Sequence, residues 1–310
     1  MNDQSTNTVL MIRPFFFRSN EQTAVNNYFQ GALEGSNLYK INDLVQSEFD
    51  RVKNVLERNG VKLLLFQDKG IHDTPDSLFP NNWFSTTHNH QIILYPMFAE
   101  NRRLERSQEV ISYLEMNFNV AEFVDFSGAE ESNVFLEGTG SLVLDHAGKI
   151  AFCCFSERSN PALFRDWCNR FEFIPVGFHA FQTSGMQRKP IYHTNVMLSI
   201  GTEWAVCCLD AIVDLAERKL VQNALQSRVL IEISEDQVSD FCANILEVKN
   251  DSGDNLIIMS QRAHNAFNAE QLNSLAQFAQ LIVVDIENIE KFGGGGVRCM
   301  LAEVFLTLKS

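Results

Sequence analysis

A cysteine that follows a run of glycines is the residue of this sequence best suited to nucleophilic chemistry. Gly293 to Gly296 precede it closely, Arg298 and Cys299 come next, and an apolar segment spans residues 301–308. Four glycines have no side chains to pack and lose much backbone freedom on ordering, so we expect the run to let the backbone approach another group closely. A neighbouring arginine favours the nucleophilic thiolate. The simpler alternative is a buried structural cysteine beside a loop.

Other polar residues stand within apolar segments, where an unpaired polar side chain is costly. Glu137 lies in the sequence Leu-Glu-Gly-Thr-Gly, His193 begins the apolar segment 193–200, and Asn81 and Asn82 lie between apolar flanks. Each has a structural alternative when taken singly: a bulge that exposes the glutamate, a hydrogen-bonded core histidine, and an asparagine turn. Their combination with the cysteine is more informative than any one of them.

Apolar periodicity divides the chain into repeated helical and extended segments. Helical spacing begins near residues 41, 103, 160, 212 and 269, at intervals of roughly 52 to 62 residues, and a shorter helical piece covers 237–246. In the first helix, 41–58, the apolar stripe consists of Leu44, Val45, Phe49, Val52 and Leu56. We expect strands at 9–12, 61–66, 84–87, 92–95, 134–144, 150–155, 173–176, 193–200, 204–209, 229–233, 256–259 and 281–285.

This order predicts an α/β fold built from five strand–strand–helix–strand units. Five such units around an axis form a five-bladed α/β propeller, with a central cavity reached from strand ends. No Pro/Gly/Ser-rich linker divides the chain, so we expect a single domain over residues 1–310. A doubly wound parallel sheet is the alternative, and it fits less well because the hairpins imply antiparallel neighbours.

Composition narrows the class of protein. The 310 residues carry a net charge of −14, which argues against a nucleic-acid or membrane partner. The seven cysteines include no C-x-x-C pair, so we expect no structural metal site. The N-terminus lacks the apolar core of a signal peptide, and no apolar stretch is long enough to span a membrane, so we expect a cytoplasmic protein. A homodimer is compatible with the sequence.

The motifs, taken in order, resemble the guanidino-group-modifying branch of the pentein superfamily, which includes arginine deiminases, dimethylarginine hydrolases and amidinotransferases. Leu-Glu-Gly at 136–138, His-Thr-Asn at 193–195 and Gly-Gly-Gly-Val-Arg-Cys-Met at 294–300 carry the resemblance, which spans nearly the whole chain. Within this branch, the sequence is most similar to the subgroup labelled citrulline-utilisation hydrolase. The resemblance implies a five-bladed α/β propeller with a Cys-His-Glu site in its central cavity.

The resemblance also implies a role for each of three residues. Cys299 is the nucleophile that attacks the planar carbon of the substrate. His193 protonates the departing nitrogen and then activates water, and Glu137 binds substrate nitrogens and orients the histidine. This chemistry needs no metal or organic cofactor, and its substrate is a small amino acid.

The sequence departs from the family pattern at two positions. Arginine deiminases usually have Arg-Asp where this chain has Asn81-Asn82, and His-x-Asp where it has His193-Thr194-Asn195. An amide offers both a donor and an acceptor, which suits the neutral ureido group of citrulline better than a cationic guanidinium. We therefore expect Asn82 and Asn195, with Asn81, to bind a ureido group.

Several alternatives remain open at the level of sequence. Arginine deiminase or amidinotransferase activity is one, and a non-catalytic pentein that serves as a binding module is another. The basic residues that can bind a substrate carboxylate are Arg102, Arg103, Arg188 and Lys189. We favour Arg188 because it lies just upstream of the His193 motif, although a solvated surface charge is the simpler interpretation of each.

Overall fold

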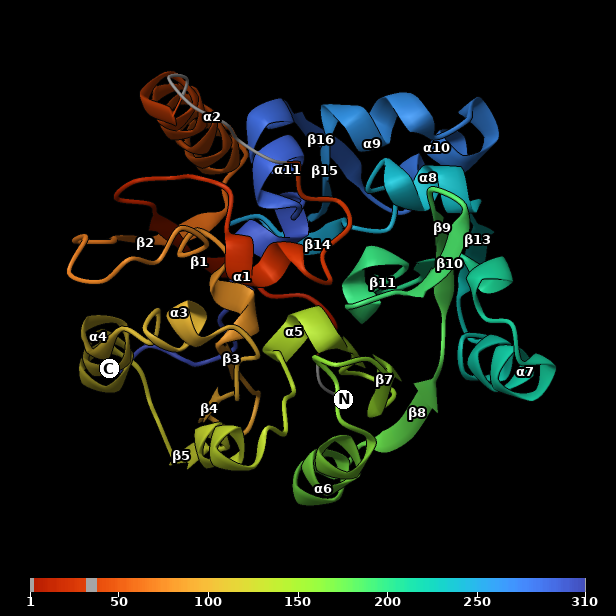
Figure 1. Cartoon of the computed structure of the whole chain (residues 1–310), viewed down its shortest axis with the longest axis horizontal. Helices are drawn as coiled ribbons and strands as arrows, with labels where there is room; N and C mark the ends of the chain where they lie inside the picture. Colours follow the sequence, from red (N-terminus) through yellow and green to blue (C-terminus); the bar gives the residue numbers. More distant parts are fainter. Residues whose placement is uncertain (1–2, 32–37, 310) are drawn as a thin grey trace.

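Five three-stranded sheets and one two-stranded hairpin form the scaffold of the computed structural model, which describes residues 3–31 and 38–309 (Figure 1). In each three-stranded sheet, the middle strand pairs antiparallel with one neighbour and parallel with the other. The sheets are β17–β1–β2 (Ala302–Glu303, Thr8–Arg13, Lys62–Gln67), β3–β4–β5 (Phe84–Thr86, Gln91–Leu94, Glu122–Asp125), β6–β7–β8 (Leu142–Asp145, Ile150–Cys154, Ile174–Phe178), β11–β12–β13 (Leu198–Ile200, Trp204–Cys207, Val229–Glu232) and β14–β15–β16 (Leu246–Lys249, Asn255–Ser260, Gln280–Val284), and the hairpin is β9–β10 (Phe181–Ser184, Gln187–Pro190).

Helices connect the parallel strands of each sheet, as a parallel crossover requires. Figure 1 shows the longer of these connecting helices at the periphery of the molecule, whereas the short helix Glu21–Ala24 and the strands β1, β3, β7, β11 and β14 lie nearer its middle. The helices are α1 (Glu21–Ala24), α2 (Leu38–Arg58), α3 (Glu100–Arg103), α4 (Gln108–Asn117), α5 (Gly138–Ser141), α6 (Pro161–Phe171), α7 (Leu215–Ala224), α8 (Glu235–Ser239), α9 (Gln261–Ala266), α10 (Ala269–Ala276) and α11 (Glu287–Gly293).

Strands from distant parts of the chain complete the first sheet. β17 pairs antiparallel with β1, with Val9 opposite Glu303, and β1 continues through α2 to the parallel strand β2. The predicted strand–strand–helix–strand unit thus occurs four times in succession and a fifth time with its first strand supplied by β17. A doubly wound parallel sheet is wrong, because every three-stranded sheet contains an antiparallel pair.

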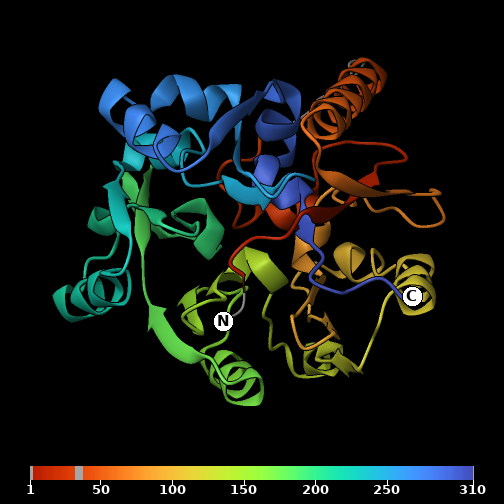
Figure 2. The ribbon, with the colours of Figure 1, turned by 180° about the vertical axis from the view of Figure 1, so that it is seen from behind.

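The segment before β1 links several sheets behind this arrangement. Figure 2 shows it crossing the middle of the molecule. Gln4 donates to the carbonyl of Leu144 at 2.9 Å, Ser5 donates to Glu247 at 2.6 Å, and Thr6 donates to the carbonyl of Val304 at 2.7 Å. One short segment therefore binds the β6 and β14 sheets and the residue that follows β17.

The predicted helices are present, with boundaries that differ in several places. In α2 the stripe formed by Val45, Phe49, Val52 and Leu56 is buried, but Leu44 is 40% exposed because it lies beside the stripe rather than on it. The helix expected from residue 103 is divided into α3 and α4, and α4 begins where Ser107 accepts a hydrogen bond from the amide of Val110. The helical piece expected over 237–246 is the shorter α8, and β14 begins at Leu246.

Two expected strands are interrupted next to the polar residues that they contain. The segment 134–144 turns at Gly138, which has φ +42, forms α5 and only then continues as β6. A side chain is excluded at this glycine, since a Cβ there would lie 2.4 Å from the carbonyl oxygen of Asn81. The segment 193–200 likewise begins with the 3-10 turn η4 (Thr194–Val196) before β11.

We predict that breaking a buried ion pair between two sheets is strongly destabilising. Arg228, next to β13, donates to both carboxylate oxygens of Asp145 at the end of β6, at 2.6 and 2.8 Å, and both side chains are at most 5% exposed. Arg228→Met leaves this carboxylate buried without its cation, so we expect a loss of about 3–5 kcal/mol of unfolding free energy in urea denaturation.

The matched control is Arg51→Met, because the Arg51–Asp285 pair is about half exposed. Its removal should change the unfolding free energy by at most about 1 kcal/mol. Equal effects of the two substitutions would contradict the assignment of stability to the buried pair.

Candidate active site

A small polar cavity gathers residues from distant parts of the chain. Its volume is about 20 Å³. Polar and charged side chains dominate its lining, and a phenylalanine, a tyrosine and three glycines complete the wall. The lining residues are Thr23, Asn27, Asp76, Asn82, Arg102, Arg158, His193 and Cys299, with Phe79, Tyr192 and Gly293 to Gly295. The cavity therefore contains three of the predicted catalytic and binding residues, and Glu137 and Asn195 contact them directly.

The glycine run allows the backbone to reach this cavity, as expected. Gly294 ends α11 in the left-handed conformation, with φ +65, and its carbonyl accepts a hydrogen bond from the hydroxyl of Tyr192 at 2.9 Å. At Gly296 a Cβ would lie 2.6 Å from Oδ1 of Asn244. Cys299 follows within the 3-10 turn η6 (Val297–Met300) and is 6% exposed.

Two amides surround the sulfur of Cys299. Nδ2 of Asn244 lies 3.3 Å from Sγ, and Nδ2 of Asn195 lies 3.6 Å from it. Burial raises the pKa of the Cys299 thiol, although the Asn244 hydrogen bond and the charge of Arg298 oppose the shift. The expected effect of Arg298 on the thiolate is thus outweighed, and Arg298 itself is engaged by Glu303 at 3.0 Å. The resting group at neutral pH is the thiol.

His193 lines the same cavity as Cys299 and forms a buried pair with Glu137. His193 Nε2 lies 2.7 Å from Oε2 of Glu137, and Arg158 Nη1 lies 3.5 Å from the same oxygen. Burial alone would raise the pKa of Glu137, but the charge of Arg158 and the hydrogen bond from His193 lower it below its ordinary value. Burial lowers the pKa of His193 to about 4, despite the opposing effect of Glu137.

These shifts define the resting proton positions. Glu137 is ionised and His193 is neutral at pH 7. Because an ionised carboxylate only accepts, Nε2 carries the histidine proton and Nδ1 is left with a free lone pair. The arrangement can therefore accept a proton at Nδ1 from a thiol or a water molecule, and Glu137 stabilises the imidazolium that results.

Asn82 and Asn195 each present one unpaired amide atom. Oδ1 of Asn82 accepts from Nη1 of Arg102 at 2.8 Å, which leaves Nδ2 without a partner. Nδ2 of Asn195 donates to the carbonyl of Thr139 at 3.2 Å, which leaves Oδ1 without a partner. One buried donor on the cavity wall and one buried acceptor on a residue that contacts Cys299 are consequently without partners.

Of the four predicted binding residues, Asn82 lines the cavity and the other three do not. Asn195 still contacts Cys299, whereas Asn81 and Arg188 are placed differently. Asn81 is fully buried, and both polar atoms of its side chain lack partners, but only its main chain contacts the site, where its carbonyl accepts from Thr139. Arg188 lies on β10 with its side chain 42% exposed and pairs with Glu235. Neither residue lines the cavity.

Asp76 is a site residue that the sequence did not indicate. It is 2% exposed and lines the cavity, where one oxygen accepts from Asn20 at 2.8 Å and from Thr23 at 3.2 Å, whereas Oδ1 has no partner. Burial raises its pKa, and the charge of Arg102 opposes the shift. Its sequence context, Thr-Pro-Asp-Ser, is that of an ordinary turn and carried no signal for a site.

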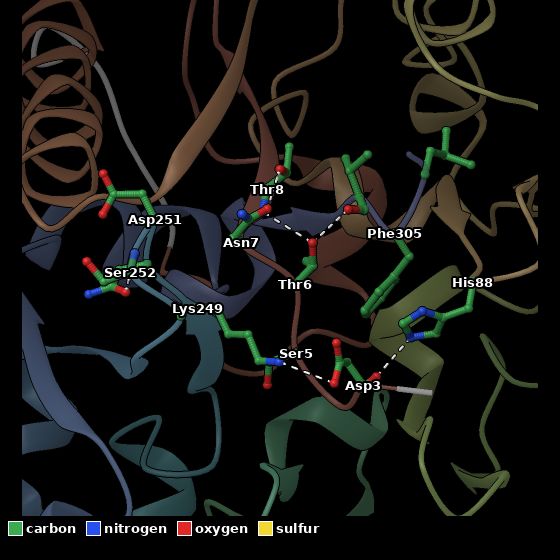
Figure 3. Close-up of a pocket in the computed structure, with 14 residues that line it drawn as sticks. Asp3, Ser5, Thr6, Asn7, Thr8, His88, Lys249, Asp251, Ser252 and Phe305 are labelled. Carbon is green, nitrogen blue, oxygen red and sulfur yellow. Dashed lines mark hydrogen bonds and ion pairs between the residues drawn. The ribbon is translucent and has the colours of Figure 1, made fainter. Parts of the chain in front are cut away.

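Larger hollows lie outside this cavity. The pocket in Figure 3 has a volume of about 470 Å³ and lies beside the segment before β1, where Lys249 pairs with Asp3 at 3.3 Å and His88 contacts the carbonyl of Asp3. None of the catalytic candidates lines it, so its size alone does not make it the active site.

Within residues 3–31 and 38–309, no group of three or more His, Cys, Asp or Glu side chains is arranged to bind a metal ion. In the same part of the chain, no helix combines the length and the apolar character of a membrane span.

We predict that alkylation of Cys299 accelerates with pH. Because the pKa of its thiol is raised above 9, the thiolate fraction should increase about tenfold per pH unit between pH 6 and 9. The measurement is the pseudo-first-order rate of iodoacetamide labelling, followed by mass spectrometry of the Cys299 peptide. The six other cysteines are buried and also have raised thiol pKa values, so they should label slowly in the native protein. A labelling rate that is constant from pH 6 to 9 would show a preformed thiolate instead.

Comparisons with solved structures show related folds. The N-terminal domain of ArgZ, an arginine dihydrolase from the ornithine-ammonia cycle in cyanobacteria, was solved as a cysteine-to-serine variant bound to substrate. It has a TM-score of 0.73 at 14% identity, over 96% of this chain and 97% of that one. AgrE in complex with ornithine and NAD+ has a TM-score of 0.74 at 14% identity, over 98% of this chain, which spans only 40% of AgrE. DDAH from Pseudomonas aeruginosa, a cysteine-to-serine variant complexed with citrulline, has a TM-score of 0.65 at 15% identity, over 97% and 100% of the two chains.

At these identities the structural likeness establishes the fold, which is that of the pentein structures. No curated protein sequence matches the chain. The sequence pattern of one family, described as N,N dimethylarginine dimethylhydrolase, eukaryotic, matches residues 13–306, which is nearly the whole chain. The chain therefore belongs to this dimethylarginine dimethylhydrolase family.

Proposed function

We propose that this protein hydrolyses a C–N bond of a ureido or guanidino amino acid through a covalent intermediate on Cys299, with a citrulline-like substrate preferred. The observation that carries the proposal is the convergence of Cys299, His193 and the Glu137 carboxylate on one cavity that also presents amides. We further infer that the five sheets are the blades of an α/β propeller whose axis passes through this site.

The resting proton positions suit a reaction in two stages. The Cys299 thiol gives its proton to Nδ1 of His193 as the sulfur bonds to the planar substrate carbon. The imidazolium then protonates the departing nitrogen, and the C–N bond breaks. In the second stage His193 takes a proton from water, the hydroxide attacks the thio-linked carbon, and the proton returns to the departing sulfur.

The unpaired amide atoms favour a ureido group. A ureido carbon bears one carbonyl oxygen, which accepts hydrogen bonds, and nitrogens, which donate them. Nδ2 of Asn82 is a buried donor without a partner and Oδ1 of Asn195 is a buried acceptor without one, which together suit that polarity. A guanidinium has only donors and leaves the Asn82 amide facing another N–H.

Charged residues of the cavity suit the remainder of an amino acid. Oδ1 of Asp76 is an unpaired carboxylate oxygen and fits an ammonium group. Arg102 and Arg158 are buried cations that line the same cavity, and each also pairs with a buried carboxylate, Arg102 with Glu105 at 2.9 Å and Arg158 with Glu137 at 3.5 Å. We propose them, in place of Arg188, as additional partners of the substrate carboxylate.

A guanidino amino acid is the second candidate. The family description names dimethylarginine, and the related ArgZ is an arginine dihydrolase. The Asp76 carboxylate can bind a guanidinium as well as an ammonium group. Hydrolysis of a guanidino group yields a ureido group, so one cavity can process both substrates in succession. Amidino transfer is a third possibility that requires an amine acceptor to replace water.

We predict that the purified protein releases ornithine from citrulline faster than it consumes arginine. Charge-assisted hydrogen bonds contribute about 1.5–3 kcal/mol against about 1 for neutral ones, so the two amides disfavour a guanidinium by about 10²-fold. The double variant Asn82→Asp/Asn195→Asp should shift the kcat/KM ratio toward arginine. The measurement is amino-acid chromatography and ammonia release with citrulline, arginine, methylarginines and agmatine.

Cys299→Ser is the control for this screen. Serine cannot form a thiolate, so this substitution should abolish turnover while the fold persists. If the wild type prefers arginine over citrulline, the preference of the two amides for a ureido group is contradicted, but the roles proposed for Cys299, His193 and Glu137 are not. Turnover by Cys299→Ser would contradict the covalent scheme. No turnover of any substrate, with slow labelling of Cys299 that no ligand alters, would favour a binding module.

We predict that a single methyl group at Gly140 impairs turnover. A Cβ there would lie 2.3 Å from Nδ2 of Asn82 and 2.7 Å from Nδ1 of His193, so both side chains must shift. A displacement of about 1 Å in a catalytic group should lower kcat by about 10²-fold. Gly128→Ala is the control, because a Cβ at that position meets no atom within 4 Å. Wild-type kcat in Gly140→Ala would show that neither side chain acts from its observed position.

A further inference from the structure

Asn244 is an amide that contacts the sulfur of Cys299 and that the reaction scheme above does not use. It lies between α8 and β14 and is 2% exposed. Its Nδ2 approaches Sγ to 3.3 Å, which is closer than the 3.6 Å of Asn195. A buried polar side chain in contact with the reacting atom requires a chemical explanation.

Two main-chain groups fix the orientation of this amide. The N–H of Arg298 can only donate, and it lies 3.1 Å from Oδ1 of Asn244. The carbonyl of Asn195 can only accept, and it lies 3.2 Å from Nδ2. The reversed amide would place a donor against the Arg298 N–H and an acceptor against a carbonyl oxygen. Nδ2 is therefore the amide atom nearer to Sγ, at 3.3 Å, and Oδ1 is the farther one, at 3.7 Å.

The same contacts join the two catalytic segments. Arg298 immediately precedes Cys299, and Asn195 follows His193 by two residues. Asn244 therefore spans the cysteine turn η6 and the histidine turn η4, and it reaches both through groups of the main chain. Gly296 makes room for it, since a Cβ there would approach Oδ1 of Asn244 to 2.6 Å.

We propose that Asn244 is a catalytic residue that stabilises the anionic sulfur of Cys299 with an N–H···S hydrogen bond. The inference rests on the proposed covalent mechanism. The sulfur is anionic as its proton leaves for His193, and again when water displaces it from the substrate carbon. The amide donor is already oriented at both moments, because the main chain holds it before the charge develops.

Few other groups can supply this stabilisation. Arg298 is the cation next to the sulfur, and its guanidinium donates to Glu303 and to the carbonyl of Leu301. His193 is neutral at rest and receives the thiol proton. The phenol of Tyr192 donates to the carbonyl of Gly294. Asn244 and Asn195 are the side-chain amides with an N–H directed at Sγ in the described part of the chain.

The test is the pH profile of Cys299 alkylation in Asn244 variants, with no substrate present. Asn244→Asp is nearly isosteric and keeps the acceptor for the Arg298 N–H, but at alkaline pH it replaces the donor with a negative charge. Asn244→Ala removes donor and acceptor together. A lost hydrogen bond to a charged group corresponds to about a 10- to 100-fold lower thiolate population at a given pH, so both variants should label more slowly by that factor.

Asn160→Asp is the matched control. Oδ1 of Asn160 also accepts main-chain N–H groups, at 2.9 and 3.1 Å, but at the start of α6 and away from the sulfur. Its labelling profile should equal that of the wild type. Circular dichroism and thermal unfolding of every variant separate an effect on the sulfur from a loss of the fold.

The outcomes distinguish this inference from the proposed function. If wild-type Cys299 labels with the expected pH profile and Asn244→Asp labels equally fast at pH 8 to 9, the role of Asn244 is refuted and the covalent mechanism stands. If wild-type Cys299 does not label even at pH 9, the nucleophile itself is refuted. If Asn244→Ala labels more slowly than the wild type but Asn244→Asp labels at the wild-type rate, the amide has a purely structural role, in which its oxygen alone matters.

Discussion

A buried carboxylate imposes the main constraint on this site. Glu137 has no exposed surface, and an ionised carboxylate in such a place persists only with opposite charge and hydrogen bonds around it. Arg158, the ring of His193 and the main-chain N–H of Phe98 supply these partners. Arg158 in turn is held by Asn26 and by the carbonyl of Thr23, so the segment around α1 is linked to the carboxylate that precedes α5.

This constraint also determines which protonation states are available for chemistry. The charge of Glu137 fixes the histidine tautomer, and burial keeps both the histidine and the thiol neutral until a substrate arrives. The glycines near Glu137 and those before Cys299 also help to assemble this site. Those next to Glu137 allow close approach of Asn82 and His193, and those before Cys299 allow close approach of Asn27 and Asn244. Proton transfer, rather than a permanent thiolate, therefore begins the reaction that we propose.

Much of the architecture could be predicted from the sequence, because helical periodicity and hairpin signals recur along the chain. The repeated unit and most strands follow from those patterns. Breaks in regular structure were not predictable in the same way: the turn at Gly138 depends on the carbonyl of Asn81, which is distant in sequence. β17 was not expected, since its two residues have no pattern of their own and are defined by pairing with β1.

The same distinction, between a local sequence pattern and contacts with distant segments, applies to the site residues. Glu137, His193 and Cys299 stand in motifs, and the structure brings them together. Asp76 and Asn244 have ordinary contexts and become site residues only through burial and through contacts with other segments. Arg188 was chosen for its nearness in sequence to His193, but the hairpin β9–β10 directs it to Glu235 instead. Proximity along the chain is a poor guide where strands reverse direction.

The pairing of β17 with β1 has a consequence for the order of events in the cell. Cys299 lies just before β17, and β17 is held in place by a strand that emerges from the ribosome long before it. The four consecutive units can assemble during synthesis, whereas the first sheet waits for this last partner. The turn that carries Cys299 is therefore anchored only when β17 pairs with β1, after the other four sheets are able to form.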